Sequence, residues 1–143
     1  HRHIAEIEQE LDPLANESFK ISFTPHAVNM VRGILATIHT FPKQKVESKD
    51  LWRALRGMYG SEPFIRLVKY VKGPYQLPDP KITMGTNYCD VGFEIDEHAN
   101  RLILFSALDN MVKGAAGQGV QCLNIVMGID ETTGLKSTGF HPM

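Results

Sequence analysis

The sequence predicts an α+β fold, with a mixed or antiparallel sheet and helices on one face. Three observations predict it. Segments with helical and with strand periodicity follow one another, two predicted strands are neighbours in the sequence, and no Gly-x-Gly-x-x-Gly pattern joins a strand to a helix. Neighbouring strands pair antiparallel, which favours α+β. The missing glycine pattern argues against a dinucleotide-binding unit in this chain.

The first half of the chain is predicted to be helix, long extended stretch, helix. Apolar residues recur at offsets of three and four over residues 4–11, which indicates a helix that ends before Pro13. An extended stretch follows over residues 20–41, and its second part alternates with β-branched residues like a strand. Ser48 is the expected N-cap of the second helix, whose apolar face ends at Gly60.

The second half is predicted to hold a hairpin and a last helix. A short apolar run over residues 64–71 is a strand or a helix end, and a Pro- and Gly-bearing loop follows over residues 73–80. Strands are expected over residues 82–95 and 101–106, joined by a tight loop. The last helix is expected from about residue 109 to residue 127, where a glycine follows.

Composition limits the classes of protein and partner. The 143 residues suit one domain, and a formal net charge of −1 gives no sign of a nucleic-acid or membrane partner. No apolar run approaches the ~20 residues of a membrane span, so a cytoplasmic protein is expected. Cys89 and Cys122 are expected to be reduced thiols, with Cys122 in the core. The start at His1 without a methionine indicates a piece of a longer protein.

The segment from His1 to Ile7 gathers two histidines, an arginine and a glutamate within two helical turns. His3 and Glu6 are three residues apart and therefore share a helix face. A carboxylate beside an imidazole favours the charged ring and orients it, as a general base requires. An exposed, mildly basic start of a helix explains the same pattern. Zinc ligation by His1 and His3 is a third interpretation, without a second cluster of ligands.

Two further segments combine unusual residues. His26 follows a proline within the extended stretch, and Arg32 precedes Gly33. An arginine fork matches a carboxylate or phosphate, although an edge-strand arginine explains the pattern too. The start of the last helix, residues 109–119, is rich in glycine and alanine at a cost of ~1 kcal/mol per glycine. Small residues there suit a ligand that passes close to the backbone, or tight packing of the helix on the sheet.

Five segments together resemble the N-acetyl-γ-glutamyl-phosphate reductase family. They occur in the family's order and span nearly the whole chain, and they are His1–Gln9, Ser22–His26, Arg32–Leu35, Gly85–Asp90 and Asp109–Gln118. The closing segment Gly128–Leu135 fits as well. The resemblance implies the second domain of such an enzyme, residues 1–143, which binds substrate and oligomerises as a homo-dimer or homo-tetramer. Its fold would be that of the C-terminal domains of glyceraldehyde-3-phosphate and aspartate-semialdehyde dehydrogenases.

The resemblance also implies a mechanism. A Rossmann domain elsewhere in the same protein would hold NADP and supply the catalytic cysteine, whose Pro-Gly-Cys motif this chain lacks. The cysteine thiolate attacks the acyl phosphate and releases phosphate, hydride reduces the thioester, and the semialdehyde leaves. The isolated chain is therefore expected to be inactive. No metal is implied.

Site residues follow from the resemblance position by position. His3, with His1 second, would shuttle protons, while Glu6 would orient the histidine or bind the substrate's amide. Arg32 would bind the substrate carboxylate with His26 nearby. Five residues would approach the nicotinamide end of NADP, and they are Asn110, Lys113, Gly114, Gly117 and Gln118.

One stretch departs from the acetylated branch of the family. Residues 26–32 resemble members that act on an amino-group carrier protein in lysine and arginine biosynthesis, whereas N-acetylglutamyl enzymes more often have a leucine and a proline here. The expected substrate is N-acetyl-γ-glutamyl phosphate of arginine biosynthesis. The alternative is an aminoadipyl or glutamyl phosphate attached to the carrier's C-terminus. A non-catalytic assembly domain is the alternative of another class.

Overall fold

The computed structural model describes residues 1–15, 18, 20–69 and 76–140, and it forms two compact units, His1–Met30 and Val31–Met143. The first unit holds helix α1 (His3–Ala15) followed by an irregular stretch. The helix was expected to end before Pro13, but it includes that proline. Pro13 lacks the amide that would bond to the Gln9 carbonyl, so it weakens the last turn, and the helix ends two residues later.

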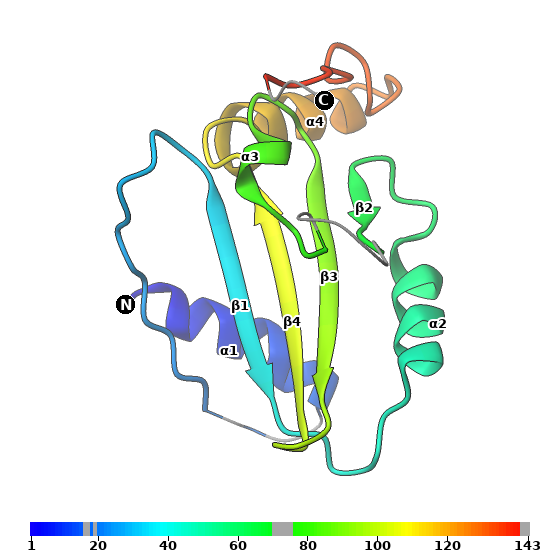
Figure 1. The fold of residues 1–143 in the computed structure, drawn as a ribbon. Helices are drawn as coiled ribbons and strands as arrows, with labels where there is room; N and C mark the ends of the chain where they lie inside the picture. The colour runs from blue at the N-terminus through cyan, green and yellow to red at the C-terminus, as the bar shows by residue number, and fades with distance from the viewer. Residues whose placement is uncertain (16–17, 19, 70–75, 141–143) are drawn as a thin grey trace. The chain divides into compact units, whose positions relative to one another are not determined.

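The second unit is built on a four-stranded mixed sheet of order β1-β4-β3-β2 (Figure 1). Its strands are β1 (Ile34–Thr40), β2 (Ile65–Leu67), β3 (Cys89–Asp96) and β4 (Arg101–Leu108). β4 pairs antiparallel with both β1 and β3, whereas β2 pairs parallel with β3. The predicted α+β class, the mixed sheet and the β3–β4 hairpin are thus confirmed.

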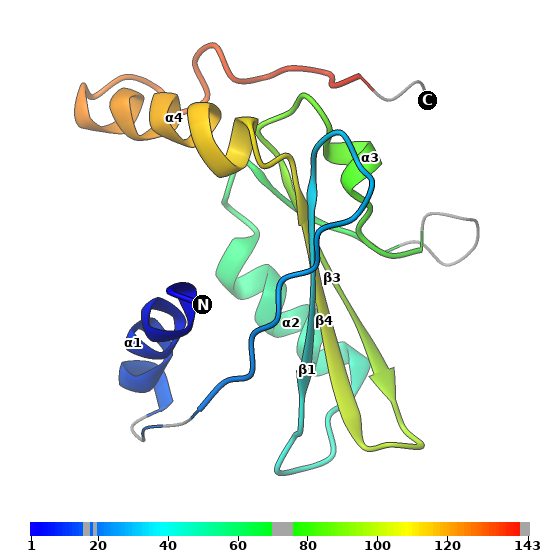
Figure 2. The ribbon, with the colours of Figure 1, turned by 90° about the vertical axis from the view of Figure 1, so that its left-hand side faces the viewer.

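Helices flank this sheet at its side and at one end. Helix α2 (Ser48–Tyr59) packs Trp52 on Phe93 of β3, with ring centroids 4.8 Å apart. Helix α3 (Pro80–Thr83), the π-helical turn η1 (Val112–Ala116) and helix α4 (Gly117–Val126) lie where β3 begins and β4 ends (Figures 1 and 2). No helix among the described residues is long and apolar enough to cross a membrane.

Several expected boundaries are wrong, for local reasons. Residues 20–33 form no strand, so only the second part of the predicted extended stretch pairs in the sheet. Ser48 is the first residue of α2 and Glu47 is its N-cap. The strand expected from residue 82 begins at Cys89, because Asp79 caps α3 by accepting from the Lys81 amide, and a proline follows at the first helical position. Residues 70–75 of the predicted run and loop lie outside the described part.

The interior of the second unit is unusually polar at the end that carries α3 and α4. Phe64, Ala107 and Leu135 are buried apolar residues there and in the sheet. Buried polar residues are more numerous, and they are Thr83, Thr86, Asn87, Asp90, Asp109, Gln121 and Asn124. Cys122, expected in the core, is exposed. A buried polar group is costly unless it is hydrogen-bonded, so the partners of these side chains define how this end is built.

Candidate functional site

The histidine cluster lies in the first unit, at the start of α1. The rings of His1 and His3 meet edge to face with centroids 4.5 Å apart, and Phe23 packs on His1 at 5.2 Å. The His3 backbone amide donates to Nδ1 of His1 (3.2 Å). Nε2 of His3 lies 4.0 Å from Oε2 of Glu6, and both side chains are accessible to solvent. The predicted pairing of His3 with Glu6 on one helix face is therefore present.

His26, the third predicted histidine, also lies in the first unit and is exposed. Glu8, which has no predicted role, joins α1 to the stretch that follows it, because its carboxylate accepts from the Ile21 amide (3.1 Å). Among the described residues, no group of three or more His, Cys, Asp or Glu side chains is arranged to hold a metal ion.

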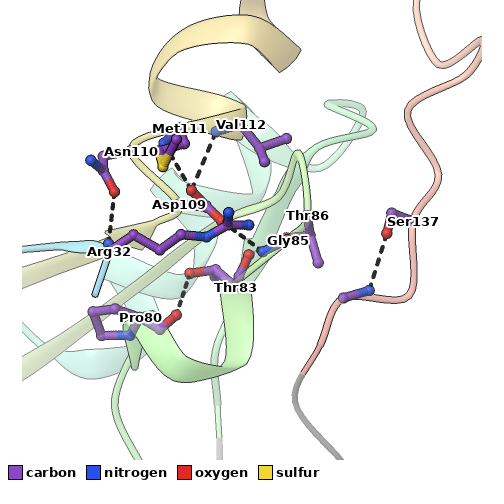
Figure 3. A network of polar contacts seen from close by, with 12 residues as sticks. Arg32, Pro80, Thr83, Gly85, Thr86, Asp109, Asn110, Met111, Val112 and Ser137 are labelled. Atoms are coloured by element: carbon purple, nitrogen blue, oxygen red, sulfur yellow. Dashed lines mark hydrogen bonds and ion pairs between the residues drawn. The ribbon is translucent and has the colours of Figure 1, made fainter. Parts of the chain in front are cut away.

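In the second unit, Arg32 is anchored by a buried carboxylate (Figure 3). Nη2 of Arg32 lies 2.7 Å from Oδ2 of Asp109, a residue with no exposed surface. The Arg32 guanidinium also lies over the Phe140 ring, 5.3 Å from its centroid, and its Nε is buried with no hydrogen-bond partner among the described residues. The arginine fork is thus positioned by one carboxylate with part of its hydrogen-bonding capacity unused.

Asp109 collects donors on both of its carboxylate oxygens. Oδ1 accepts from the amides of Met111 and Val112, and Oδ2 accepts from the amide of Gly85 (2.7 Å). Burial alone would raise the pKa of Asp109, but the Gly85 and Met111 amides and the charge of Arg32 outweigh it and hold that pKa below its ordinary value. No role of its own was predicted for Asp109. An aspartate just before a helical segment is a capping signal that could have identified it.

Two segments that are far apart in the sequence, around Arg32 and around Asp109, meet in the structure. Besides the pair of Arg32 with Asp109, the neighbouring Gly33 donates its amide to Oδ1 of Asn110 (2.7 Å). Gly33 has φ 121°, a backbone conformation that side chains rarely adopt. Arg32 and Asn110, predicted to contact substrate and cofactor respectively, are therefore held at the same end of the sheet by two adjacent bonds.

The five predicted cofactor residues divide into two sets. Asn110, Gly114 and Gln118 are exposed. Lys113 instead points inward, where Nζ donates to Oε1 of Gln121 (2.7 Å) and lies 5.6 Å from the centroid of the Phe64 ring. Burial lowers the pKa of Lys113, and the nearby Cys89 and Glu131 offset this only in part.

Gly117 is buried and makes room for the side chain of Asn87. A Cβ at this position would collide with Oδ1 of Asn87 and would lie 2.8 Å from the Val112 carbonyl oxygen. Packing of the helix thus uses the small size of Gly117, which is one of the two explanations that the sequence leaves open. Asn87 itself donates to Oε1 of Gln121 (3.0 Å), whose Nε2 donates to Glu131 (2.8 Å). The sequence reasoning missed this buried network.

Comparisons with known proteins place these features in a family. A family model described as "Semialdehyde dehydrogenase, dimerisation domain" matches residues 1–110. The chain is 50% identical over 143 residues to a protein of Nitrosopumilus maritimus and 52% identical to one of Haloquadratum walsbyi. Both carry the name "Putative [LysW]-L-2-aminoadipate/[LysW]-L-glutamate phosphate reductase". A relative from Thermomicrobium roseum, named "Putative [LysW]-L-2-aminoadipate 6-phosphate reductase", is 50% identical over 146 residues.

These relatives are longer than the chain, and a solved structure supports the fold. The whole chain is matched in each relative, but it spans only 40–41% of their length. Aspartate semialdehyde dehydrogenase II of Vibrio cholerae, solved in complex with ASA, superimposes with a TM-score of 0.61 at 21% identity. The match covers 89% of this chain and 37% of that one. At this identity the likeness supports the fold alone.

Proposed function

The chain belongs to the semialdehyde dehydrogenase dimerisation-domain family, and we propose that it is the substrate-binding and oligomerisation part of an NADP-dependent reductase of carrier-bound aminoadipyl or glutamyl phosphate. The observation that carries this proposal is 50–52% identity, along the whole chain, to relatives whose names specify LysW-linked substrates. N-acetyl-γ-glutamyl phosphate, which the sequence first favours, is the second candidate, supported by the motifs shared with that family.

The proposed proton transfer uses His3. Its Nε2 faces Oε2 of Glu6 at 4.0 Å, so the carboxylate orients the ring for proton transfer. A substrate can reach the His3 side chain, because 45% of its surface is exposed. His1 is the second candidate. Its Nδ1 already accepts the His3 amide, which leaves Nε2 as the atom that can carry a proton.

The proposed substrate anchor is Arg32. Asp109 takes one Nη2 contact and fixes the guanidinium plane, so the remaining donors can meet a substrate carboxylate in a fork geometry. Asp109 acts here as a positioning residue. His26 belongs to the other unit, and its role beside Arg32 stays a prediction.

Three of the five residues proposed to contact NADP are exposed to solvent. Gly114 is exposed, so a flat ring can approach its backbone from the solvent side. Gln118 is exposed one turn later, and Asn110 is exposed beside Gly33. Lys113 and Gly117 are turned away from this surface, where Lys113 bonds to Gln121 and Gly117 packs against Asn87. When bound, NADPH would supply the hydride that reduces the acyl group.

Assembly into a homo-oligomer is the second part of the proposal. The matching family model is described as a dimerisation domain. Edge strand β1 pairs only with β4 among the described residues, and it exposes 48% of Ile34, 51% of Leu35 and 48% of Ile38. Because successive strand residues point to opposite faces, β1 presents apolar surface on both.

The reductase proposal is tested with the longer protein, of the length that its relatives have. NADP⁺ reduction is followed with the semialdehyde attached to the carrier protein and, separately, with N-acetylglutamate semialdehyde, each with and without phosphate. We expect phosphate-dependent activity on the carrier-bound substrate, and a loss of about 100-fold or more in kcat for His3→Ala, as the loss of a general acid–base predicts. His98→Ala, at an exposed histidine of the hairpin loop, is the matched control.

The outcomes separate the candidate functions. Activity on the acetylated semialdehyde alone would reject the carrier-bound substrate in favour of N-acetyl-γ-glutamyl phosphate. Activity that His3→Ala leaves intact would reject the proton-transfer role while keeping the reductase. No activity on either substrate would favour a non-catalytic assembly domain.

A further inference from the structure

Phe140 is a large apolar side chain that is exposed and yet held in place. It exposes 69% of its surface. Its backbone amide donates to the Met84 carbonyl oxygen (3.1 Å). The preceding Gly139 has φ 81°, and a Cβ there would lie 3.0 Å from the same carbonyl oxygen. The segment that carries Phe140 is therefore bound closely to the turn that follows α3.

The Phe140 ring lies against Gly85 and Arg32, and neither belongs to the hydrophobic core. The ring is so close to the Gly85 backbone that a Cβ there would lie 2.6 Å from two of the ring carbons. The Arg32 guanidinium lies over the ring, 5.3 Å from its centroid, which is the geometry of a cation–π contact. Because most of Phe140 stays in water, burial does little to hold it here, and the contact with Arg32 is its most specific interaction.

Arg32 and Gly85 meet a second time, at Asp109. Oδ2 of Asp109 accepts from the Gly85 amide (2.7 Å) and lies 2.7 Å from Nη2 of Arg32. A single ion pair fixes one end of a guanidinium but leaves the group free to turn about that contact. The Phe140 ring under the guanidinium removes part of this freedom. The two contacts together orient a planar fork, which binds a carboxylate through both of its arms only when it is correctly aligned.

We propose that Phe140 is a positioning residue for substrate binding: its ring holds the Arg32 guanidinium in the orientation that receives the substrate carboxylate. This inference rests on the proposed function, in which Arg32 anchors the substrate. A substrate carboxylate can reach the group, because 20% of the Arg32 side chain is exposed beside its buried partner Asp109. The segment that ends at Phe140 thereby becomes part of the substrate site.

The test uses the longer protein and compares wild type with Phe140→Leu. Leucine keeps an apolar side chain beside Gly85 but offers no aromatic face to the guanidinium. The KM for the semialdehyde that the wild type oxidises is measured at saturating phosphate and NADP⁺. We expect KM to rise about two- to fivefold, the factor that an exposed cation–π contact is worth. The kcat should stay unchanged, because the carboxylate does not react and its binding is equal in the ground and transition states.

Two control variants separate the ring from other effects. Phe140→Tyr keeps the aromatic face and should keep the wild-type KM. Phe41→Leu removes a matched contact, because Phe41 is 73% exposed and the Arg101 guanidinium lies 5.5 Å from its ring centroid. Phe41 follows the last residue of β1, whereas Arg32 precedes the first, so this contact lies at the opposite end of the strand. Phe41→Leu should leave KM unchanged.

A second measurement follows the contact without turnover. Phenylglyoxal modifies accessible guanidinium groups, and mass spectrometry of the digested protein reports the peptide that contains Arg32. Loss of the ring should speed this modification about twofold or more in Phe140→Leu, because the cation–π contact no longer holds the group. Phe140→Tyr should react at the wild-type rate. Equal rates in all three proteins would overturn the proposed contact.

The outcomes distinguish this inference from the reductase proposal. An active enzyme whose KM is unchanged by Phe140→Leu would overturn the role of Phe140 and leave the reductase in place. An equal rise in KM for Phe140→Leu and Phe140→Tyr would overturn it too, and so would a fall in kcat at constant KM. No turnover of either semialdehyde by the wild type would reject the proposed function and the substrate role of Phe140 with it.

Discussion

Replacing Asp109 with asparagine should destabilise the second unit strongly, because it removes a buried charge that four donors share. The side-chain oxygen of the new amide can still accept from Met111 and Val112. Its nitrogen would then face two donors, the Gly85 amide and the Arg32 guanidinium. Hydrogen bonds to charged groups are worth about 1.5–3 kcal/mol each, so losing two predicts a cost of about 3–6 kcal/mol.

Chemical denaturation at neutral pH measures this cost, with Asp130→Asn as the control. Asp130 is exposed and caps Thr132 within a surface turn, so its replacement should change the free energy of unfolding far less. A loss below about 1 kcal/mol for Asp109→Asn would refute the reasoning, because it would mean that the buried carboxylate carries no net charge-assisted bonding.

The pH dependence supplies a second check on the same variant. The pKa of Asp109 lies below its ordinary value of 3.8, so its contribution to stability is complete above that value. The contribution is lost as pH falls through the lower, folded-state pKa. The difference in stability between wild type and Asp109→Asn should therefore be constant at neutral pH and shrink in acid. A difference that stays constant into strong acid would contradict the assigned protonation state.

Two further predictions concern α4 and its support. Gly117→Ala should lower the free energy of unfolding by about 1–3 kcal/mol, because the new methyl group meets Asn87 and the Val112 carbonyl. Gly119→Ala, which has open space around it, should instead stabilise the helix by about 0.5–1 kcal/mol. Equal effects of the two changes in thermal denaturation would contradict the packing role of Gly117. Burial lowers the pKa of Lys113, so the native state disfavours its charge, and wild type should gain stability relative to Lys113→Met as pH rises towards 10.5. Denaturation curves at alkaline pH measure this, and parallel profiles would argue against a desolvated ammonium.

Much of the fold can be predicted from local patterns, because its strongest elements have strong periodicity. The β3–β4 hairpin, α2 and β1 follow from alternation, helical spacing and a terminal Gly60. The start of β3 could not be read in the same way, because the apolar Ile82 suits a strand as well as the short α3 that Asp79 caps. The histidine pair with Glu6 was predictable, since it depends only on helix spacing.

The rest of the site depends on contacts between distant residues. Nothing local to Arg32 indicates that it pairs with Asp109, which lies 77 positions further along the chain. The bond between Gly33 and Asn110 spans the same separation. Cys122 was assigned to the core because it lies among apolar residues, but the packed face of α4 is set by Gln121 and Asn124. Apolar content alone therefore predicts the wrong face of this helix, because the buried hydrogen bonds outweigh it.

The polar inner face of α4 also determines how temperature acts on its attachment. Hydrophobic contacts weaken on cooling, since their burial carries a large heat-capacity change, whereas burial of polar surface changes heat capacity in the opposite direction. The bonds of Gln121 and Asn124 are contacts of the second kind. The attachment of α4 to the rest of the second unit should thus keep its strength in the cold, while any partner on its exposed apolar residues would release more readily as the temperature falls.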